Sequence, residues 1–240
     1  GPTTQTLSVH SPLKYEKIGL GFSFVNDELG FENFTYMYGD FSYTIQLNEI
    51  SNLAFGLKAG FTAFSVDNEL YTSNTNDQLI SNIENRWSPN VGAGVYLFSE
   101  NTYFGVSVPN LFETKHFDNN SVAITREKMH YYVIGGHVFD ISPSLKFKPA
   151  FLTKIVEGAP LQADITANFL INDKLTLGAA YRWSAAISGL IGFQISESWF
   201  IGYGYDMETT KLSNYNSGSH EIFLRYELFN NSRISSPRFF

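Results

Sequence analysis

The chain has 240 residues, a formal net charge of −7 and no cysteine. The negative charge argues against nucleic-acid binding, which relies on clustered Lys and Arg. The absence of cysteine excludes disulfides and thiolate metal sites. Aromatic and charged residues each make up 16% of the chain, and mean hydropathy is −0.12. Many aromatics and few charges are typical of a protein with an apolar outside and a polar inside.

Alternation of apolar and polar residues recurs along the chain and predicts β-strands, whereas helical periodicity is almost absent. In 174–183, for example, Leu175, Leu177 and Tyr181 face one way, while Thr176 and Arg182 face the other. In chain order, about thirteen strands are predicted near 3–12, 17–25, 34–47, 51–65, 89–99, 102–109, 128–141, 145–155, 160–171, 174–183, 185–196, 198–206 and 219–229.

The predicted connections nearly alternate between short and long. Short turns fall near 12–17, 47–51, 99–102, 141–144, 171–174 and 196–198, and longer loops near 25–33, 66–88, 110–127 and 206–218. The connections at 155–160 and 183–185 are short exceptions on the long-loop side. Short turns on one rim and long loops on the other indicate an all-β, antiparallel transmembrane β-barrel of the bacterial outer membrane, with the long loops extracellular.

An odd number of antiparallel strands cannot close, because the first and last strands would run parallel. We therefore expect about 14 strands in the full protein and one N-terminal strand missing from residues 1–229, the barrel domain. The chain starts Gly1-Pro2-Thr3 without Met or signal peptide, so it is expected to be processed or truncated. Residues 230–240 are predicted to form a C-terminal tail, and both termini are predicted to be periplasmic.

Charged residues of both signs fall on the strand phase assigned to the barrel lumen. The candidate lumen network comprises Asp40, Lys58, Lys148, Asp164, Arg182, Glu221, Arg225 and Glu227. Paired charges would fill the lumen, and unpaired charges would line a water channel. Inward Phe64, Phe98 and Phe200 favour the filled interpretation. Inward glycines such as Gly202 are interpreted as relief of curvature, with room for an inserted segment as the alternative.

The sequence holds no recognisable catalytic set or metal motif. Ser219 beside His220 suggests a membrane hydrolase, but polar residues at a junction between loop and strand explain the pair better. We therefore expect neither enzymatic activity nor a cofactor.

Two other regions are candidates for binding a partner. Loop residues with polar or aromatic side chains are candidates for contacting a cargo, namely Asp67, Asn68, Glu69, Tyr71, Trp87, Asn214, Tyr215 and Asn216. The tail ends Pro237-Arg238-Phe239-Phe240, and this basic, aromatic stretch is a candidate periplasmic docking segment. The alternatives for the tail are a plug inside the lumen and a disordered end.

Several strings resemble the PorP/SprF family over essentially the whole chain. They are Thr4-Gln5-Thr6-Leu7-Ser8-Val9-His10-Ser11-Pro12, Ser107-Val108-Pro109-Asn110-Leu111, Lys146-Phe147-Lys148-Pro149, Ala179 with Tyr181-Arg182-Trp183, Ile191-Gly192-Phe193-Gln194-Ile195-Ser196, Phe200-Ile201-Gly202-Tyr203, Asn214-Tyr215-Asn216-Ser217-Gly218-Ser219-His220-Glu221-Ile222 and Ser236-Pro237-Arg238-Phe239-Phe240.

The resemblance implies an outer-membrane component of the type IX secretion system of Bacteroidota. It implies partners of three kinds: secreted cargo with a C-terminal signal domain, other components of the system, and outer-membrane lipid. Some members of the family are linked to gliding motility through secretion of surface adhesins. The resemblance assigns no catalytic residue. The alternative from the residues alone is a passive or substrate-specific channel.

Overall fold

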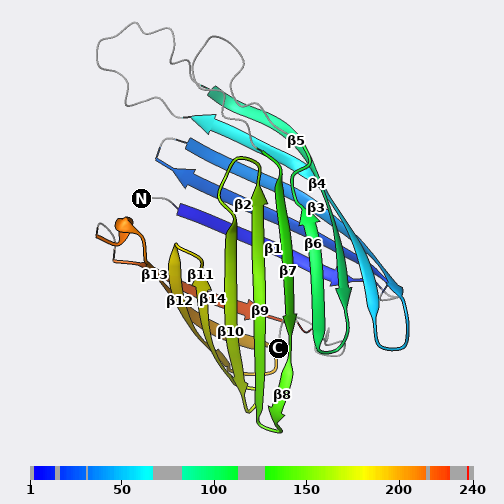
Figure 1. Ribbon diagram of the computed structural model, residues 1–240. Coiled ribbons are helices and arrows are strands. Elements are labelled where there is room, and N and C mark those ends of the chain that lie inside the picture. Colours follow the sequence, from blue (N-terminus) through cyan, green and yellow to red (C-terminus); the bar gives the residue numbers. More distant parts are fainter. Residues whose placement is uncertain are drawn as a thin grey trace, which may run out of the picture. The chain divides into compact units, whose positions relative to one another are not determined.

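The computed structural model describes residues 3–13, 17–30, 32–66, 83–112, 128–214, 217–227 and 237. These residues form antiparallel strands and one short 3-10 helix, η2 (Lys211–Asn214) (Figure 1). The strands are β1 (Thr3–Pro12), β2 (Ile18–Leu29), β3 (Glu32–Gln46), β4 (Asn52–Val66), β5 (Ile83–Phe98), β6 (Thr102–Val108), β7 (His130–His137), β8 (Phe139–Ser142), β9 (Leu145–Val156), β10 (Gln162–Ile171), β11 (Leu175–Arg182), β12 (Ala186–Gln194), β13 (Trp199–Glu208) and β14 (Ser219–Tyr226).

The strands form one sheet in sequence order, with β8 pairing β9 beside the main path. Since β7 and β8 together cover the strand predicted at 128–141, each predicted strand has a counterpart in the structure. The all-β, antiparallel class is therefore confirmed. The hydrogen-bonded path begins at β1 and ends at β14, and among the described residues no pairing joins these two strands. The described sheet is accordingly not closed.

Two predicted loop boundaries were wrong. The long loop expected at 25–33 is a tight hairpin, because β2 continues to Leu29 and β3 begins at Glu32, with Gly30 at a φ of 62° between them. The strand expected from residue 89 begins at Ile83. In the hairpin, Asn26, Asp27 and Glu28 are polar on both faces of the strand, so the alternation that marks a strand disappears although the pairing continues.

The chain consists of two compact units. The first holds β1 to β4, most of β5, and the region around residues 107–131, and the second holds most of the remaining strands. In the second unit, short turns set the register: Asn172 and Asp173 both have positive φ, at 52° and 51°, as a type I′ hairpin turn requires. The Lys174 amide donates to the Ile171 carbonyl at 3.1 Å to close that turn.

Register in the second unit separates the side chains into two faces. One row of paired residues crosses six strands and is wholly apolar: Phe147, Phe169, Leu177, Ile191, Tyr203 and Ile222. We call this side the apolar face. Five of these side chains are exposed, with Ile222 79% accessible, and Phe147 is half-buried. Because successive side chains of a strand point to opposite faces, the neighbouring row lies on the other side.

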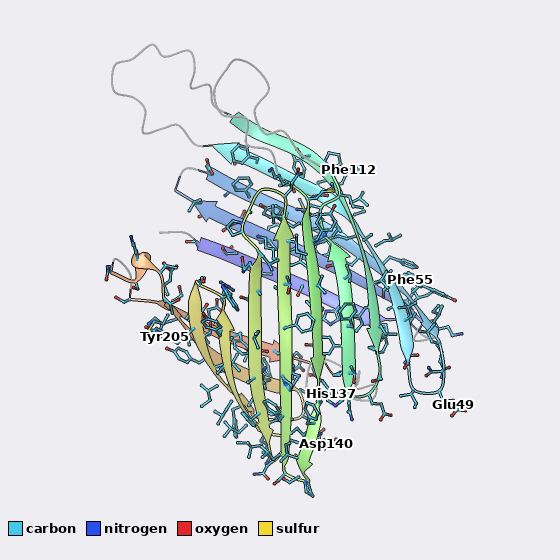
Figure 2. All side chains as sticks on the ribbon, in the orientation of Figure 1. Glu49, Phe55, Phe112, His137, Asp140 and Tyr205 are labelled. Carbon is cyan, nitrogen blue, oxygen red and sulfur yellow. The ribbon has the colours of Figure 1, made fainter. Side chains whose placement is uncertain are left out.

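That neighbouring row consists of Lys148, Asn168, Gly178, Leu190, Gly204 and Glu221, and we call this side the polar face. The first unit shows the same division, because apolar Phe41, Phe55 and Phe61 are exposed on β3 and β4, and Figure 2 labels Phe55 on β4. The alternating residues Asp40 and Lys58 lie on the polar face of those strands.

Aromatic side chains edge the apolar face of the second unit at both strand ends. Near the short turns, the ring centroids of Phe147 and Phe169 are 4.8 Å apart and those of Trp199 and Tyr226 are 4.5 Å apart. At the opposite end, Tyr205 lies 5.0 Å from His220 (Tyr205 is labelled in Figure 2). The nine residues from Leu175 in β11 to Trp183 directly after it span roughly 26 Å. An apolar band of this height, with aromatic rings at both ends, matches the apolar band of a membrane-spanning barrel.

We predict that Ala179→Arg, at the middle of the apolar face of β11, lowers the free energy of unfolding in lipid vesicles by about 2–4 kcal/mol, because a guanidinium would enter hydrocarbon. Urea titration of the refolded protein measures the change. The matched control is Thr176→Arg on the polar face of the same strand, which we expect to cost much less. Equal losses for the two variants would contradict the assignment of the faces.

Candidate functional site: the polar face of the sheet

The best-formed ion pair of the polar face joins two adjacent strands. Asp164 on β10 and Arg182 on β11 are register partners. Arg182 Nε donates to Asp164 Oδ1 at 2.8 Å, and Nη2 donates to Oδ2 at 3.5 Å. Asp206 on β13 contributes a second negative charge near the same guanidinium. A two-pronged guanidinium–carboxylate contact fixes both side chains, so this part of the predicted network is a paired group.

A second group lies at the short-turn end of β13 and β14. Arg225 Nε lies 3.3 Å from Glu227 Oε1, and the Arg225 guanidinium lies 5.0 Å from the centroid of the Phe200 ring. The Phe200 and Phe223 centroids are 5.8 Å apart, with their planes at 30°. The guanidinium therefore combines an ion pair with a cation–π contact.

Glycines leave room for these two rings. A Cβ on Gly192 would meet the Phe200 ring, and a Cβ on Gly202 would meet the Phe223 ring. Gly192 and Gly202 are themselves register partners on β12 and β13. Both rings therefore lie across the sheet. The space above Gly202 is filled by the Phe223 ring of the next strand. The two interpretations from the sequence, relief of curvature and room for an inserted segment, did not include this packing.

The first unit has its own group on the polar face. Lys58 Nζ lies 4.0 Å from the centroid of the Tyr38 ring, and Asp40 is close enough to attract it. The Tyr38 hydroxyl lies 3.3 Å from Thr62 Oγ1. Phe64, which is 2% exposed, packs with its centroid 4.6 Å from that of Phe34. Aromatic rings thus fill much of this face between its charges.

The predicted lumen residues fall into separate groups within the two units. Within the second unit, Asp164 pairs with Arg182, and Arg225 pairs with Glu227. Lys148 is 8% exposed and faces Asn168 across the strand pair, and Glu221 faces Gly204. Sequence reasoning missed Tyr38 and Phe223 as members of these groups. Their positions two residues from Asp40 and Arg225 were the available signal.

The structure corrects one candidate loop residue. Trp87 lies within β5 and is exposed on the apolar face, where its ring makes an edge contact with Phe61 at 6.5 Å. The strand was predicted to begin at residue 89, but β5 begins at Ile83 and therefore includes Trp87. Asn214 ends η2. The remaining candidates, Asp67, Asn68, Glu69, Tyr71, Tyr215 and Asn216, lie outside the described residues.

Of the candidate tail residues, only Pro237 is described, and it is buried. Arg238, Phe239 and Phe240 lie outside the described residues.

Ser219 and His220 are consecutive residues of β14, so their side chains point to opposite faces of the strand. The His220 ring lies on the apolar face, where its Nδ1 is 2.6 Å from the Tyr203 hydroxyl. A serine nucleophile needs its base within hydrogen-bond reach. His220 is therefore not placed to act as a general base for Ser219.

The described ranges contain neither a cluster of metal ligands nor a long apolar helix. Among those residues, no three His, Asp or Glu side chains gather as metal ligands do. In the same part of the chain, no helix has the length and apolar character needed to cross a membrane.

We predict a coupling energy of about 1 kcal/mol between Arg182 and Asp164, because the contact is two-pronged but the arginine is partly exposed. A double-mutant cycle with Arg182→Gln and Asp164→Asn measures it by urea unfolding. The matched control is the more exposed Lys146–Asp173 pair, at 3.5 Å, for which we expect less than about 0.5 kcal/mol. Similar coupling in the two pairs would show that the Arg182 contact is not special.

We also predict that Gly202→Ala destabilises the protein by roughly 1–3 kcal/mol, since the new methyl group would displace the Phe223 ring. Gly189→Ala is the control, because a Cβ on Gly189 meets nothing within 4 Å. Thermal or urea unfolding should separate the two variants. If both are neutral, the Phe223 ring does not lie over Gly202.

Comparison with known proteins identifies the family. A model of the family described as type IX secretion system membrane protein PorP/SprF matches residues 1–226. No curated protein matches the chain by sequence. The family match spans every strand of the described sheet and, apart from Glu227, both groups on the polar face of the second unit. The chain belongs to the PorP/SprF family of type IX secretion system membrane proteins.

Proposed function

We propose that this protein is an outer-membrane accessory of the type IX secretion system that binds a cargo with a C-terminal signal domain, such as a gliding adhesin. In this role it helps to export the cargo or to anchor it at the cell surface. The observation that carries the proposal is the family match over residues 1–226. Membership of that family also implies association with other components of the secretion system.

The proposed location is the outer membrane, with the long connections outside the cell and both termini in the periplasm. The apolar face supports a bilayer environment, because a row of exposed apolar side chains on five adjacent strands would be an aggregation surface in water. Lipid also demands that every backbone N–H and C=O be paired. We therefore propose that the edges of β1 and β14 are covered in the membrane, so that the sheet is completed as a barrel.

The proposed cargo contacts lie on the long connections, at 67–82 and 113–127. Both connections leave the same end of the alternating strands, after β4 and after β6. Asp67, Asn68, Glu69 and Tyr71 belong to the first of them. Connections of this length inside a compact fold are commonly functional, which supports placing recognition there.

A passive or substrate-specific channel is the second candidate, and the charged groups of the polar face favour it. The packing of that face argues against a wide aqueous pore, because Phe64 and Tyr103 are both less than a tenth exposed. A wide channel would place such rings in water. We rank the secretion accessory first for that reason.

We further propose that the protein is not an enzyme and uses no cofactor. The opposed side chains of Ser219 and His220 support this proposal, since they remove the one nucleophile–base pair that the sequence suggested.

We predict that mild-detergent purification of the tagged full-length protein from native outer membranes recovers a signal-domain cargo or other secretion components, identified by mass spectrometry. Replacing residues 67–71 with Gly and Ser should abolish cargo recovery if the long connections bind it. The matched control replaces the short turn 99–101 in the same way and should leave recovery intact.

A barrel that copurifies with no such partner would oppose the accessory role. Steady conductance of that protein in planar bilayers would then favour the channel.

A further inference from the structure

The first unit carries a polar surface on the same side of the sheet as its exposed apolar residues. On that side, register joins β1, β2 and β3 into rows that change character toward the hairpin at Gly30. The row Leu7, Phe24 and Met37 is apolar. The next two rows toward the hairpin are wholly polar, and we call them the polar extension: Gln5, Asn26 and Thr35, followed by Thr3, Glu28 and Asn33.

The side chains of the polar extension hold one another in place. Thr35 Oγ1 donates to Asn26 Oδ1 at 2.8 Å, and Asn26 Nδ2 donates to Glu28 Oε1 at 3.2 Å. Asn33 Nδ2 donates to the same Glu28 oxygen at 3.5 Å. The carboxylate is thus fixed between two amides. A ligand would meet groups that are already ordered, which lowers the entropic cost of binding.

Part of the hydrogen-bonding capacity of the polar extension is not used within the protein. Glu28 and Gln5 are exposed, and within the described part of the chain neither Glu28 Oε2 nor the Gln5 side-chain amide makes a hydrogen bond. An amide offers donors and an acceptor, and a carboxylate offers acceptors only. Hydroxyl groups, which both donate and accept, match this mixture. A phosphate group offers mainly acceptors and would be repelled by Glu28.

The height of the polar extension, in the proposed outer-membrane location, selects the kind of molecule that carries those hydroxyls. The hairpin lies at the same end of the first unit as the long connection after β4 (Figure 1). From Leu7 to Thr3 the strand rises about 13 Å, or roughly 10 Å of height at the tilt usual for membrane barrels. The polar layer of a bilayer is only about 5–8 Å thick on each side. A small headgroup would leave the outermost row uncovered, whereas an oligosaccharide headgroup reaches it.

We propose that the polar extension binds the saccharide headgroup of a glycolipid whose acyl chains lie against the apolar rows below it. Sugar hydroxyls donate to the Glu28 carboxylate and bond the amides of Gln5 and Asn33. One amphiphile covers both levels, because the polar and apolar rows belong to the same face of the same three strands. This inference rests on the proposed membrane location and is independent of cargo binding.

The test measures which lipid the protein retains. The full-length protein is refolded into vesicles of phosphatidylcholine and digalactosyl diacylglycerol with matched acyl chains, and then extracted in mild detergent. Mass spectrometry gives the ratio of the two lipids bound to the protein. We expect the digalactosyl lipid to be enriched roughly tenfold over its share of the vesicle, as about two net hydrogen bonds would give.

A paired variant locates the binding surface. Gln5→Leu with Asn33→Leu removes two amides of the polar extension without changing the charge, and should lower the retained ratio to that of the vesicle. The matched control, Thr4→Val with Thr6→Val, makes two changes from polar to apolar on the opposite face of β1 and should keep the enrichment.

Heat-modifiable gel mobility checks the fold of each variant. If the paired variant does not fold, Gln5→Leu alone serves in its place, because Gln5 is exposed. This single change should lower the enrichment roughly threefold, as the loss of one hydrogen bond would.

Three outcomes would overturn the proposal for a protein that has entered the vesicles. Equal retention of the two lipids would show that the surface does not prefer sugar. Enrichment that the paired variant leaves unchanged would place the sugar elsewhere. Displacement of the glycolipid by free digalactose at an equal concentration would show a site for a soluble saccharide. Failure of the refolded protein to enter vesicles is a distinct result, since it would contradict the membrane location itself and this inference with it.

Discussion

The antiparallel hydrogen-bond ladder is the constraint on which the rest of this structure depends. It forces consecutive side chains of each strand onto opposite faces, and the register then aligns residues of like character from strand to strand. The row from Phe147 to Ile222 and the row from Lys148 to Glu221 differ by one position on every strand. A slip of one residue at any pair would place charges among the apolar side chains, so register and membrane compatibility are specified together.

Two kinds of interaction stabilise the polar face. Local ion pairs, as between Asp164 and Arg182, satisfy charge between neighbouring strands. Aromatic rings, as at Tyr38 and Phe223, fill space beside glycines and accept cations on their faces. Because most pairs involve adjacent strands, their contribution is local, and partly exposed pairs of this kind are individually weak.

The edges of the described sheet, at β1 and β14, are the feature of the fold that bears most directly on the proposed location in a membrane. Thirteen strands on an antiparallel path leave β1 and β14 running in the same direction, so the two cannot pair in the antiparallel manner of their neighbours. In water, exposed edges invite pairing with other chains, and in lipid they are not tolerated. The proposed outer-membrane location therefore requires that the edges of β1 and β14 in the described sheet be covered.

The sequence by itself determined the all-β class, the number of strands on the path and the division into two faces, because alternation with period two is a local property that each strand carries. It also pointed to the charged residues of the polar face, since Asp40, Arg182 and Arg225 keep the same phase as their strand. Where strands leave the apolar band, as at Asn26 to Glu28 and around Trp87, the alternation fades or misleads, and only pairing revealed that the strands continue.

Tertiary structure alone decided which polar residues meet. The pairing of Arg182 with Asp164, the position of Lys58 over Tyr38 and the cover of Phe223 over Gly202 depend on register between strands, and register is not written in any one strand. The separation of Ser219 from His220 follows instead from local strand geometry once β14 is known to include both. The physical reason for the difference is that alternation is encoded within a strand, whereas contact across a sheet is encoded by turns and neighbours together.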